Sequence, residues 1–408
     1  MNTVIYGNGV TGKALKVALC ERGEKVIIFD DNKAKSETDK LDLRVVDKVV
    51  VSPGVANRKF ISRLRLHRIL VTNEFDEFSN CKAKLISVTG TNGKTTITSL
   101  IHHILNKNQY SSFLLGNGGV PFCSKSDILT ENDIVVLESS SFQLQNTKSF
   151  SPKISLCANF SPNHLNVHKN IKDYYRAKRN NFIRQTKNDF SIFCFDDEQT
   201  RKMASLSHAK VLFYSIKQEV EGCYLCNDGG IEFRHKIDTT KYFGHNLQNI
   251  LGAVLVCFLC GVTIDKSIGR INSFKWLPHR MQFVQKIKNV QFVDDSKATT
   301  VTATISAVNE IKGNLALILG GSSKKENFND LFKNIRQIDC VAVCGDKNCH
   351  LCVDMKEAVY MCYNAVCNTT ATVLLSPACA SFDRYISFEA RGEDFCRIIG
   401  ELANNGIV

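Results

Sequence analysis

The residues Gly90-Thr91-Asn92-Gly93-Lys94-Thr95-Thr96 have the types and the order that surround a polyphosphate. They follow an apolar run and open a helical pattern, so backbone N–H groups, a lysine and two hydroxyls would converge on one point. Such a set suits a nucleoside triphosphate with its magnesium ion. The general phosphate loop has a glycine five residues before Gly93, where this chain has Val88. The loop is therefore a shortened variant, G-T-N-G-K-T.

A second glycine loop, Gly7–Gly12, lies near the N-terminus and fits the pattern G-x-G-x-x-G. It separates the strand-like run Thr3–Tyr6 from a helical pattern, and Asp30 follows the next strand, Lys25–Phe29. Glycines here let the backbone approach a diphosphate, and the acid suits a ribose hydroxyl. Ser52-Pro53-Gly54 ends another short strand and is a second candidate loop for the same ligand. The pattern predicts a nucleotide diphosphate without saying which nucleotide.

Polar residues also follow strands in the middle of the chain. Glu138 comes directly after the run Asp133–Leu137, where a carboxylate beside a phosphate loop is placed to hold Mg²⁺. His164 follows the run Ile154–Ala158, and Lys178 lies in a helical pattern soon after. Taken singly, this histidine and this lysine fit ordinary structural roles as well as functional ones.

Three similar loops follow strands in the C-terminal third. Asp294–Thr299 combines acids, hydroxyls and a lysine, and Gly320–Lys324 and Ser376–Ser381 end the next strands of this region. Ligands of parallel α/β sheets bind at the carboxyl ends of strands. These loops therefore favour a site for a nucleotide ribose and an anionic substrate.

Strand-like runs alternate with helical patterns along almost all of the 408 residues, so we expect an α/β fold with parallel sheets. A new unit begins near Glu74, and Leu277-Pro278 marks a second break. We expect a Rossmann-like domain at residues 1–73, a P-loop ATPase-type domain at 74–276 and a second Rossmann-like domain at 277–408. The segment Cys223–Ile237 predicts a hairpin that turns at Asn227–Gly230.

The composition narrows the class of protein. Apolar residues make up 44% and charged residues 23%, as in ordinary globular proteins. The formal net charge of +12 is spread along the chain without a basic run, so we expect anionic small substrates and no nucleic acid. The longest apolar stretch, Ile250–Val262, is shorter than the ~20 residues of a membrane span. No targeting segment is visible, and we expect a cytoplasmic protein without a membrane span.

Seventeen cysteines include three pairs with C-x-x-C spacing. Most cysteines are expected to be small buried residues, because a disulfide framework is unusual in a long cytoplasmic chain. A zinc site at the third pair stays open as an alternative, since Cys344 and His350 lie close to it. The pairs are Cys223/Cys226, Cys257/Cys260 and Cys349/Cys352.

Read together, these motifs resemble the Mur ligase family, ATP-dependent amide-forming enzymes that build the peptide of bacterial cell-wall precursors. G-T-N-G-K-T is that family's version of the phosphate loop. The last matching segments are the most specific and favour the members that add D-glutamate. In order along the whole chain the segments are Gly90–Thr95, Gly116–Gly119, Glu138–Leu144, His164, Tyr174–Lys178, Gly244–Asn246, Leu277–Arg280, Asp295–Thr299, Leu375–Asp383 and Phe388–Gly392.

The resemblance implies that the first domain holds the uridine diphosphate of UDP-N-acetylmuramoyl-L-alanine rather than a nicotinamide cofactor. It also implies an ATP site around the phosphate loop. The residues implied for the UDP-substrate are Val10, Thr11, Asp30, Ser52, Gly54 and Asn117. Those implied for ATP are Gly90, Thr91, Asn92, Gly93, Lys94, Thr95, Thr96, Asn246, Asn249, Arg280 and Asp295.

Two Mg²⁺ ions and a modified lysine are implied as well. Lys178 matches the family lysine that is carbamylated by CO₂, a change that turns a cation into an anion able to sit among metals. The implied metal ligands are Thr95, Glu138, His164 and Lys178, and the implied catalytic residues are Lys94, Glu138, His164 and Lys178. The residues implied for D-glutamate are Lys297, Thr299, Lys324, Ser381 and Phe388.

The reaction implied by the resemblance is amide synthesis during the assembly of peptidoglycan precursors. The terminal carboxylate of the UDP-substrate attacks the γ-phosphate of ATP and gives an acyl phosphate with ADP. The D-glutamate amine then attacks the acyl carbon and expels phosphate. The repulsion between two anions in the first step would be offset by Lys94, Arg280 and the metals. We expect the enzyme to act as a monomer.

Some positions depart from the family pattern. Asn163 and Asn166 stand where acids flank the family histidine, and Thr300 stands where asparagine is common. The missing charge at position 163 removes an expected support for His164.

Three alternatives remain beside the D-glutamate ligase. Another family member, such as the L-alanine-adding ligase, shares most of these motifs. A nicotinamide-dependent dehydrogenase would explain Gly7–Gly12 but leaves Gly90–Thr96 unexplained. A non-catalytic P-loop switch would leave Glu138, His164 and Lys178 without a role.

Overall fold

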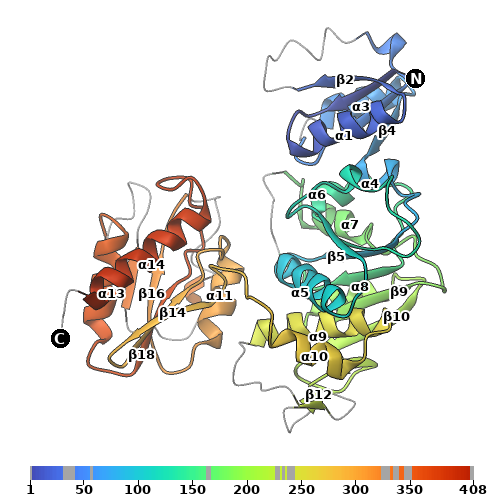
Figure 1. The fold of residues 1–408 in the computed structure, drawn as a ribbon. Coiled ribbons are helices and arrows are strands. Elements are labelled where there is room, and N and C mark those ends of the chain that lie inside the picture. Colours follow the sequence, from blue (N-terminus) through green and yellow to red (C-terminus); the bar gives the residue numbers. More distant parts are fainter. Residues whose placement is uncertain are drawn as a thin grey trace. The chain divides into compact units, whose positions relative to one another are not determined.

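The structure is a computed structural model, drawn in Figure 1. The chain divides into two compact units, one holding Met1–Tyr242 with Asn246–Phe274 and the other holding Phe243–His245 with Lys275–Val408. The structure describes residues 2–30, 42–55, 58–161, 167–225, 230–231, 235–236, 244–322, 331–333, 340–343 and 352–404.

The first sheet is parallel, with the strand order β2-β1-β3-β4. Helix α1 packs Leu15 and Leu19 on Ile5 and Val50 at one face, and α3 packs Leu64 on the other. This arrangement is the one expected of a Rossmann-like sheet, because parallel strands need cover on both faces. The elements are β1 (Asn2–Tyr6), α1 (Val10–Glu21), β2 (Lys25–Phe29), η1 (Leu43–Val45), β3 (Lys48–Val51), α3 (Arg58–Leu66) and β4 (Leu70–Asn73).

The second sheet is also parallel, with the order β11-β10-β9-β8-β5-β7-β6. The strand before the phosphate loop, β5, lies between β7 and β8, so the residues after those strands flank the loop. The elements are α4 (Glu74–Glu77), β5 (Lys84–Thr89), α5 (Lys94–Lys107), β6 (Ser112–Gly116), η2 (Phe122–Ser124), β7 (Ile134–Glu138), α6 (Ser141–Leu144), β8 (Ile154–Cys157), α7 (Ile171–Arg179), β9 (Phe190–Cys194), α8 (Glu198–Ala204), β10 (Lys210–Ser215), β11 (Gly222–Tyr224), β12 (Gly230–Ile231), β13 (His235–Lys236), α9 (Gly244–Leu259) and α10 (Ile264–Ile271).

One hydrophobic core joins these two sheets. The cluster that contains Ile5 and Leu19 of the first sheet continues into Phe75, Phe122 and Leu137 of the second, and all five side chains are buried. Burial of apolar surface contributes roughly 25 cal/mol per Å². The first two sheets are therefore packed as one compact unit.

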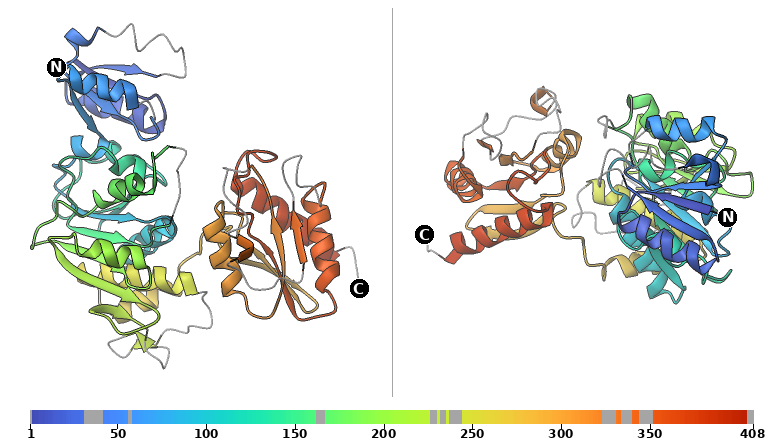
Figure 2. Two further views of the ribbon diagram at one scale, coloured as in Figure 1. Left: turned by 180° about the vertical axis from the view of Figure 1, so that it is seen from behind. Right: turned by 90° about the horizontal axis from the view of Figure 1, so that it is seen from above.

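The second unit holds a five-stranded sheet, β14-β15-β18-β16-β17, in which only the pairing of β14 with β15 is antiparallel among the described strands. Helices α13 and α14 cover one face and α11 covers the other, as Figures 1 and 2 show. The elements are β14 (Gln282–Ile287), β15 (Val290–Asp294), α11 (Val301–Glu310), β16 (Asn314–Leu319), β17 (Cys340–Val343), α13 (Met355–Val366), β18 (Ala371–Leu375) and α14 (Phe388–Asn404).

The predicted α/β class is confirmed, and most predicted strands and helices agree with the observed ones to within two residues. The predicted hairpin turn at Asn227–Gly230 lies, except for Gly230, outside the described residues. The antiparallel pair is β12 with β13, which begins only at Gly230, and the preceding strand β11 pairs in parallel with β10.

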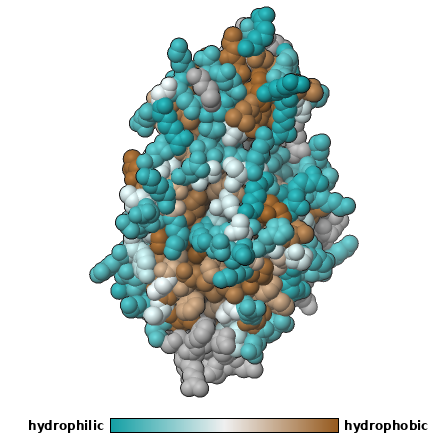
Figure 3. All heavy atoms as spheres, turned by 90° about the vertical axis from the view of Figure 1, so that its right-hand side faces the viewer, coloured by the Kyte–Doolittle hydropathy of each residue, from teal (hydrophilic) through white to brown (hydrophobic). Residues whose placement is uncertain are grey.

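The surface and the cysteines complete the description. None of the described helices combines the length and the apolar character needed to cross a membrane. Figure 3 shows one face of the molecule, where polar side chains cover most of the surface and apolar areas appear between them. Cys257 and Cys260 are buried and free, as predicted. Cys344, Cys349 and His350, on which the zinc alternative rests, lie outside the described residues, as does Cys226 of the first pair.

Candidate functional site

The phosphate loop connects β5 to α5 through two glycines with positive φ. Gly90 has φ 159° and Gly93, the N-cap of α5, has φ 81°. Only glycine adopts the second conformation without strain, and it aims the first N–H groups of α5 at the loop. Lys94 Nζ lies over the loop, donating to the carbonyls of Gly90 and Thr91 at 2.9 Å each. Thr95 and Thr96 follow on the first turn of α5. The geometry is that of an anion site at a helix N-terminus.

Asn159, which the sequence analysis did not single out, fixes this loop. Its Oδ1 accepts the N–H of Asn92 at 2.8 Å, its Nδ2 donates to the carbonyl of Asn92 at 3.2 Å, and its own carbonyl accepts the N–H of Thr91 at 2.8 Å. It lies just after β8, the neighbour of β5. A polar residue at the end of an adjacent strand was the available signal.

One of the two predicted ATP residues of α9, Asn249, reaches the phosphate loop. A Cβ built on Gly93 would lie 2.5 Å from Asn249 Oδ1, so the asparagine packs directly on the glycine. Asn246 lies three residues earlier, on the same face of the helix, and both side chains are nearly buried. The structure therefore brings Asn249 to the phosphate loop.

Glu138, at the end of β7, is brought together with Asn117, which follows β6. Asn117 donates its backbone N–H to the carbonyl of Glu138 at 2.8 Å and its Nδ2 to Oε1 at 3.0 Å. A Cβ on Gly118 would lie 2.6 Å from Glu138 Oε2, so the glycine loop closes over the carboxylate. The predicted metal ligand and the predicted substrate contact thus share one hydrogen-bonded cluster.

Two of the predicted metal ligands among the described residues have oxygen atoms that suit Mg²⁺. Glu138 offers a carboxylate and Thr95 a hydroxyl, both hard oxygen ligands of the kind that Mg²⁺ prefers. Among the described residues no three His, Cys, Asp or Glu side chains cluster as a ready metal site. His164 lies outside the described residues.

Lys178, on α7, is buried beside the phosphate loop. Its Nζ donates to the carbonyl of Gly90 at 2.6 Å and to Thr89 Oγ1 at 3.3 Å, and it lies 4.9 Å from the ring centre of Tyr174. Burial, and then the charge of Lys94, lower the pKa of Lys178 well below its ordinary value. Burial therefore favours the neutral amine over the ammonium form.

The glycine loop of the first sheet packs on the loop that follows β3. A Cβ on Gly12 would lie 1.9 Å from the carbonyl of Gly7, and Ser52 Oγ donates to that same carbonyl at 3.3 Å. Asp30 Oδ2 accepts the N–H of Asn8 at 2.8 Å. Asp30 and Ser52 thus meet at one glycine loop. Val10 and Thr11 open α1 beside it.

A pocket in the first unit begins at the loop after β3 and extends to α6. Ser52 and Gly54, predicted for the UDP-substrate, lie in its wall. Gln143, which the sequence analysis did not assign, lies opposite, and its side chain closes a capping box with Ser140 at the start of α6. The lining residues are Val51, Ser52, Pro53, Gly54, Val55, Asn73, Glu74, Phe75, Phe142, Gln143, Gln145 and Asn146.

In the second unit, two residues predicted for D-glutamate lie together. Lys297 Nζ lies 3.7 Å from the ring centre of Phe388, a cation–π contact. The imidazole of His279 meets the same ring edge-on, and its Nδ1 lies 2.6 Å from Asp294 Oδ2. Thr299 donates its N–H to the carbonyl of Lys297 at 2.8 Å.

Buried polar side chains fix the loops of this unit to one another. Asp295 accepts from the N–H of Met281 at 3.2 Å and from Ser376 Oγ at 3.0 Å. Arg391 donates to Ser296 and to the carbonyls of Gly320 and Cys379, and burial lowers its pKa to about 10. All three strand-end loops are thereby tied together. Of the other predicted residues, Ser381 is buried, Arg280 is half-buried, and Lys324 lies outside the described residues.

Comparisons with known proteins agree with this geometry. Residues 88–257 match the model of the Mur ligase middle domain, and residues 279–379 match that of the Mur ligase glutamate ligase domain. A UDP-N-acetylmuramoylalanine--D-glutamate ligase of Clostridioides difficile is 33% identical, covering 96% of each chain. One of Listeria innocua is 34% identical over 87% of this chain and 82% of its own. The chain belongs to the Mur ligase family.

Solved structures of other Mur ligases share the fold. A MurF ligase from Thermotoga maritima in complex with ADP has a TM-score of 0.59 at 19% identity, with 89% of this chain and 98% of that chain covered. UDP-N-acetylmuramate-alanine ligase from the same organism has a TM-score of 0.56 at 16% identity, with 98% and 100% covered. At such identities the likeness concerns the Mur ligase fold alone.

Proposed function

We propose that this Mur ligase is the ATP-dependent enzyme that joins D-glutamate to UDP-N-acetylmuramoyl-L-alanine in peptidoglycan precursor synthesis. The observation that carries the proposal is the agreement along nearly the whole chain with relatives named UDP-N-acetylmuramoylalanine--D-glutamate ligase. We assign residues 1–73, 74–276 and 277–408 to three domains, one for each large sheet. The enzyme works as a cytoplasmic monomer.

ATP binds at the phosphate loop. The N–H groups at the start of α5 and Lys94 contact its phosphates, and Asn246 and Asn249 contact the adenosine, together with Arg280 and Asp295 of the third domain. Two Mg²⁺ ions, when bound, neutralise the charge that builds up on the transferred phosphoryl group. Thr95, Glu138 and His164 would hold these ions. The hydrogen bond from Asn117 leaves Glu138 Oε2 for this purpose.

The UDP-substrate binds between the glycine loop and the pocket. Val10, Thr11, Asp30, Ser52 and Gly54 contact the uridine diphosphate, and Asn117 contacts the sugar–peptide end. The substrate carboxylate attacks the γ-phosphate, the bond to ADP breaks, and an acyl phosphate forms. Lys94 and Arg280 offset the repulsion between the two anions.

D-glutamate binds at the loops of the third domain. Lys297 and Lys324 provide positive charge for its carboxylates, and Thr299, Ser381 and Phe388 complete the site. The amine attacks the acyl carbon and the phosphate leaves. The cation–π contact of Lys297 with Phe388 supports this assignment, because it presents the ammonium group at the site in a fixed place.

Lys178 is carbamylated in the working enzyme. Its neutral amine attacks the carbon of CO₂ and loses a proton, which leaves a carbamate with one negative charge beside the phosphate loop. The depressed pKa of Lys178 supports this reaction, since only a neutral amine is nucleophilic. A Lys178→Ala variant should lose turnover and regain part of it with an added short-chain carboxylic acid. Full activity without the lysine contradicts the role.

The decisive experiment measures phosphate release from ATP with UDP-N-acetylmuramoyl-L-alanine and a panel of amino acids. We expect release that depends on D-glutamate. Release that prefers L-alanine with UDP-N-acetylmuramate would assign the chain to the L-alanine-adding branch. In a thermal-shift assay UDP should stabilise the protein and NAD should not, and the opposite result would favour a dehydrogenase.

A further inference from the structure

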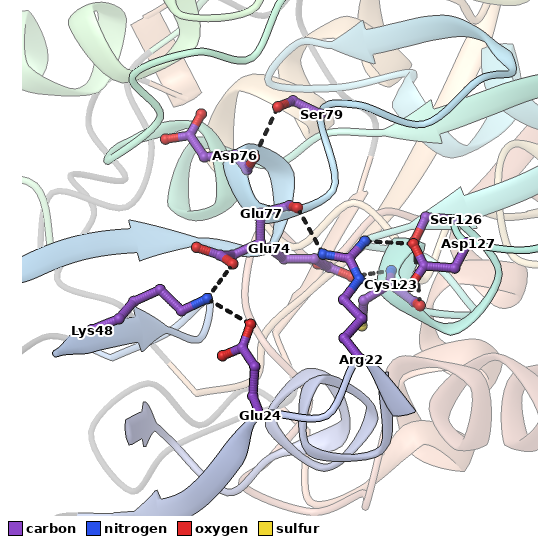
Figure 4. A network of polar contacts seen from close by, with 10 residues as sticks. All are labelled: Arg22, Glu24, Lys48, Glu74, Asp76, Glu77, Ser79, Cys123, Ser126 and Asp127. Atoms are coloured by element: carbon purple, nitrogen blue, oxygen red, sulfur yellow. Dashed lines mark hydrogen bonds and ion pairs between the residues drawn. The ribbon is translucent and has the colours of Figure 1, made fainter. Parts of the chain in front are cut away.

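The four-residue helix α4 lies where the first sheet meets the second, and its three acids bind three different partners. Figure 4 shows the partners of Glu74 and Glu77. Asn73 caps it by accepting the N–H of Asp76 at 3.1 Å, and Asn73 Nδ2 also donates to the carbonyl of Gln143 at 3.0 Å. A helix this short has little stability of its own. Its place is therefore set by what its side chains bind.

Glu77 connects α4 to β3. Lys48, on β3, donates from Nζ to Glu77 Oε2 at 2.7 Å and to Glu24 Oε1 at 3.0 Å, and its side chain is only 4% exposed. Two carboxylates around one buried ammonium more than balance its charge, so the ammonium is not left unpaired in the interior. Four residues after Lys48, β3 leads into Ser52 and the wall of the substrate pocket.

Asp76 connects α4 to the chain that follows α6. Its carboxylate accepts the N–H groups of Lys148, Ser149 and Phe150 at 2.6, 2.9 and 3.0 Å, and the hydroxyl of Ser149 at 3.1 Å. Charge-assisted bonds to three successive backbone groups hold a segment in one conformation. That segment follows Phe142–Asn146, the opposite wall of the pocket.

Glu74 connects α4 to η2. Its Oε1 accepts the N–H of Cys123 at 3.1 Å, and burial raises its pKa. Arg22, at the end of α1, donates to the carbonyl of Glu77 at 3.2 Å, pairs with Asp127 and lies 3.9 Å from the ring centre of Phe78. The ends of α1, β3, η2 and α6 are thus all tied to one turn of helix.

We propose that Asp76 and Glu77 are positioning residues for the UDP-substrate: from α4 they hold the two walls of the pocket at a fixed separation. The walls come from the loop after β3, through Lys48 and Glu77, and from α6, through Asp76. Preorganisation of this kind lowers the cost of ordering the site on binding. The inference rests on the proposed function, because it takes the pocket to be the site of the UDP-substrate.

The test compares Asp76→Asn with a matched control, Asp189→Asn. Asp189 also locks backbone in the first unit, accepting the N–H of Thr186 at 2.8 Å and pairing with Lys153, but it does not line the pocket. We expect Asp76→Asn to raise KM for the UDP-substrate about fivefold and to leave kcat and KM for ATP within about twofold. In the control variant, kcat and both KM values should stay unchanged, although the melting temperature falls by a similar amount.

Direct binding of UDP, measured by calorimetry, distinguishes a failure of the proposed function from a failure of the positioning role. If the wild-type protein does not bind UDP, the proposed function fails. If it binds UDP and the Asp76→Asn variant binds equally well, the positioning role fails. Equal changes in the KM values of ATP and the UDP-substrate, or the same KM change in Asp189→Asn, also overturn it.

A second variant covers the case in which Asp76→Asn does not fold. Glu77→Gln removes one of the two carboxylates around Lys48 and leaves Glu24 in place, so the ammonium stays paired. We expect the same selective rise in KM for the UDP-substrate, at about half the fold-change. An unchanged KM in a folded Glu77→Gln protein contradicts the proposal.

Discussion

In each of the two glycine loops of the first unit, a side-chain oxygen accepts a backbone N–H. The accepting side chain is charged in one loop and neutral in the other. Asp30 Oδ2 accepts the N–H of Asn8 at 2.8 Å, and Asn159 Oδ1 accepts the N–H of Asn92 at 2.8 Å. A carboxylate therefore lies at the first loop, whereas a neutral amide and Lys94 lie at the second. The phosphate loop keeps its positive field for a more anionic ligand, while the first loop presents an acceptor suited to hydroxyls.

The largest effect is expected from Lys94→Ala, which removes the cation that distinguishes the two loops. Its Nζ donates to two backbone carbonyls of the loop itself, and neither bond joins separate elements of the sheet, so we expect the fold to survive. Phosphate release should fall on the order of 10²–10³-fold. Steady-state kinetics with circular dichroism as the folding control would measure it. A loss below about threefold would show that the charge difference between the loops has no catalytic meaning.

Asn159→Asp places a carboxylate at the phosphate loop, where the first glycine loop already has one. An acceptor for the N–H of Asn92 remains, but a negative charge now faces the phosphates and the donor to the carbonyl of Asn92 is lost. Affinity for ATP should fall roughly tenfold or more. Adenosine serves as the control ligand, since it carries no phosphate. If adenosine and ATP weaken equally, the effect is one of loop geometry and the electrostatic comparison fails.

The reverse exchange, Asp30→Asn, makes the first loop resemble the second. The bond to Asn8 can persist, so only the charge and its stronger acceptor are lost. We expect UDP to bind about fivefold more weakly and ATP binding to stay unchanged, as calorimetry with each nucleotide would show. Tighter UDP binding would mean that the diphosphate lies close to the carboxylate and is repelled by it.

The smallest effect concerns Glu74, which lies between the two sheets. Because its folded-state pKa is raised, the stability linked to its protonated form is fully present below the ordinary carboxyl pKa and is lost as the pH rises through the folded value. Glu74→Gln keeps an acceptor for Cys123 without a titrating group. Relative to wild type, the variant should gain stability as the pH rises from acid to alkaline, measured as the free energy of urea unfolding. A constant difference across that range contradicts a raised pKa.

The parts of the site that lie in continuous motifs could be predicted from sequence. Gly90–Thr96 is one continuous segment, so its turn and the start of its helix follow from residue types alone. Asn249 and Phe388 were predicted from the resemblance to the family. The parts that depend on neighbouring strands could not. Asn159 meets Asn92 only because β8 pairs with β5, a contact 67 residues apart along the chain.

The fold shows the same limit. Periodic patterns of apolar residues predicted the strands and helices, because the buried face of each element carries apolar residues at a regular spacing. They did not predict that β14 pairs antiparallel with β15, nor that a single core joins the first two sheets through Phe75 and Phe122. Both depend on which buried faces meet, and that information is not carried by any one segment.

The central place of β5 in its sheet has a consequence for how the protein is made. β5 emerges from the ribosome before its two partners, β7 and β8, and the phosphate loop gains Asn159 only once β8 has paired. Parallel pairings over such separations form slowly, since the intervening chain must close first. A nascent chain that ends before Ile154 therefore has the complete G-T-N-G-K-T motif without a formed nucleotide site, and ATP binding marks the folding of the second sheet.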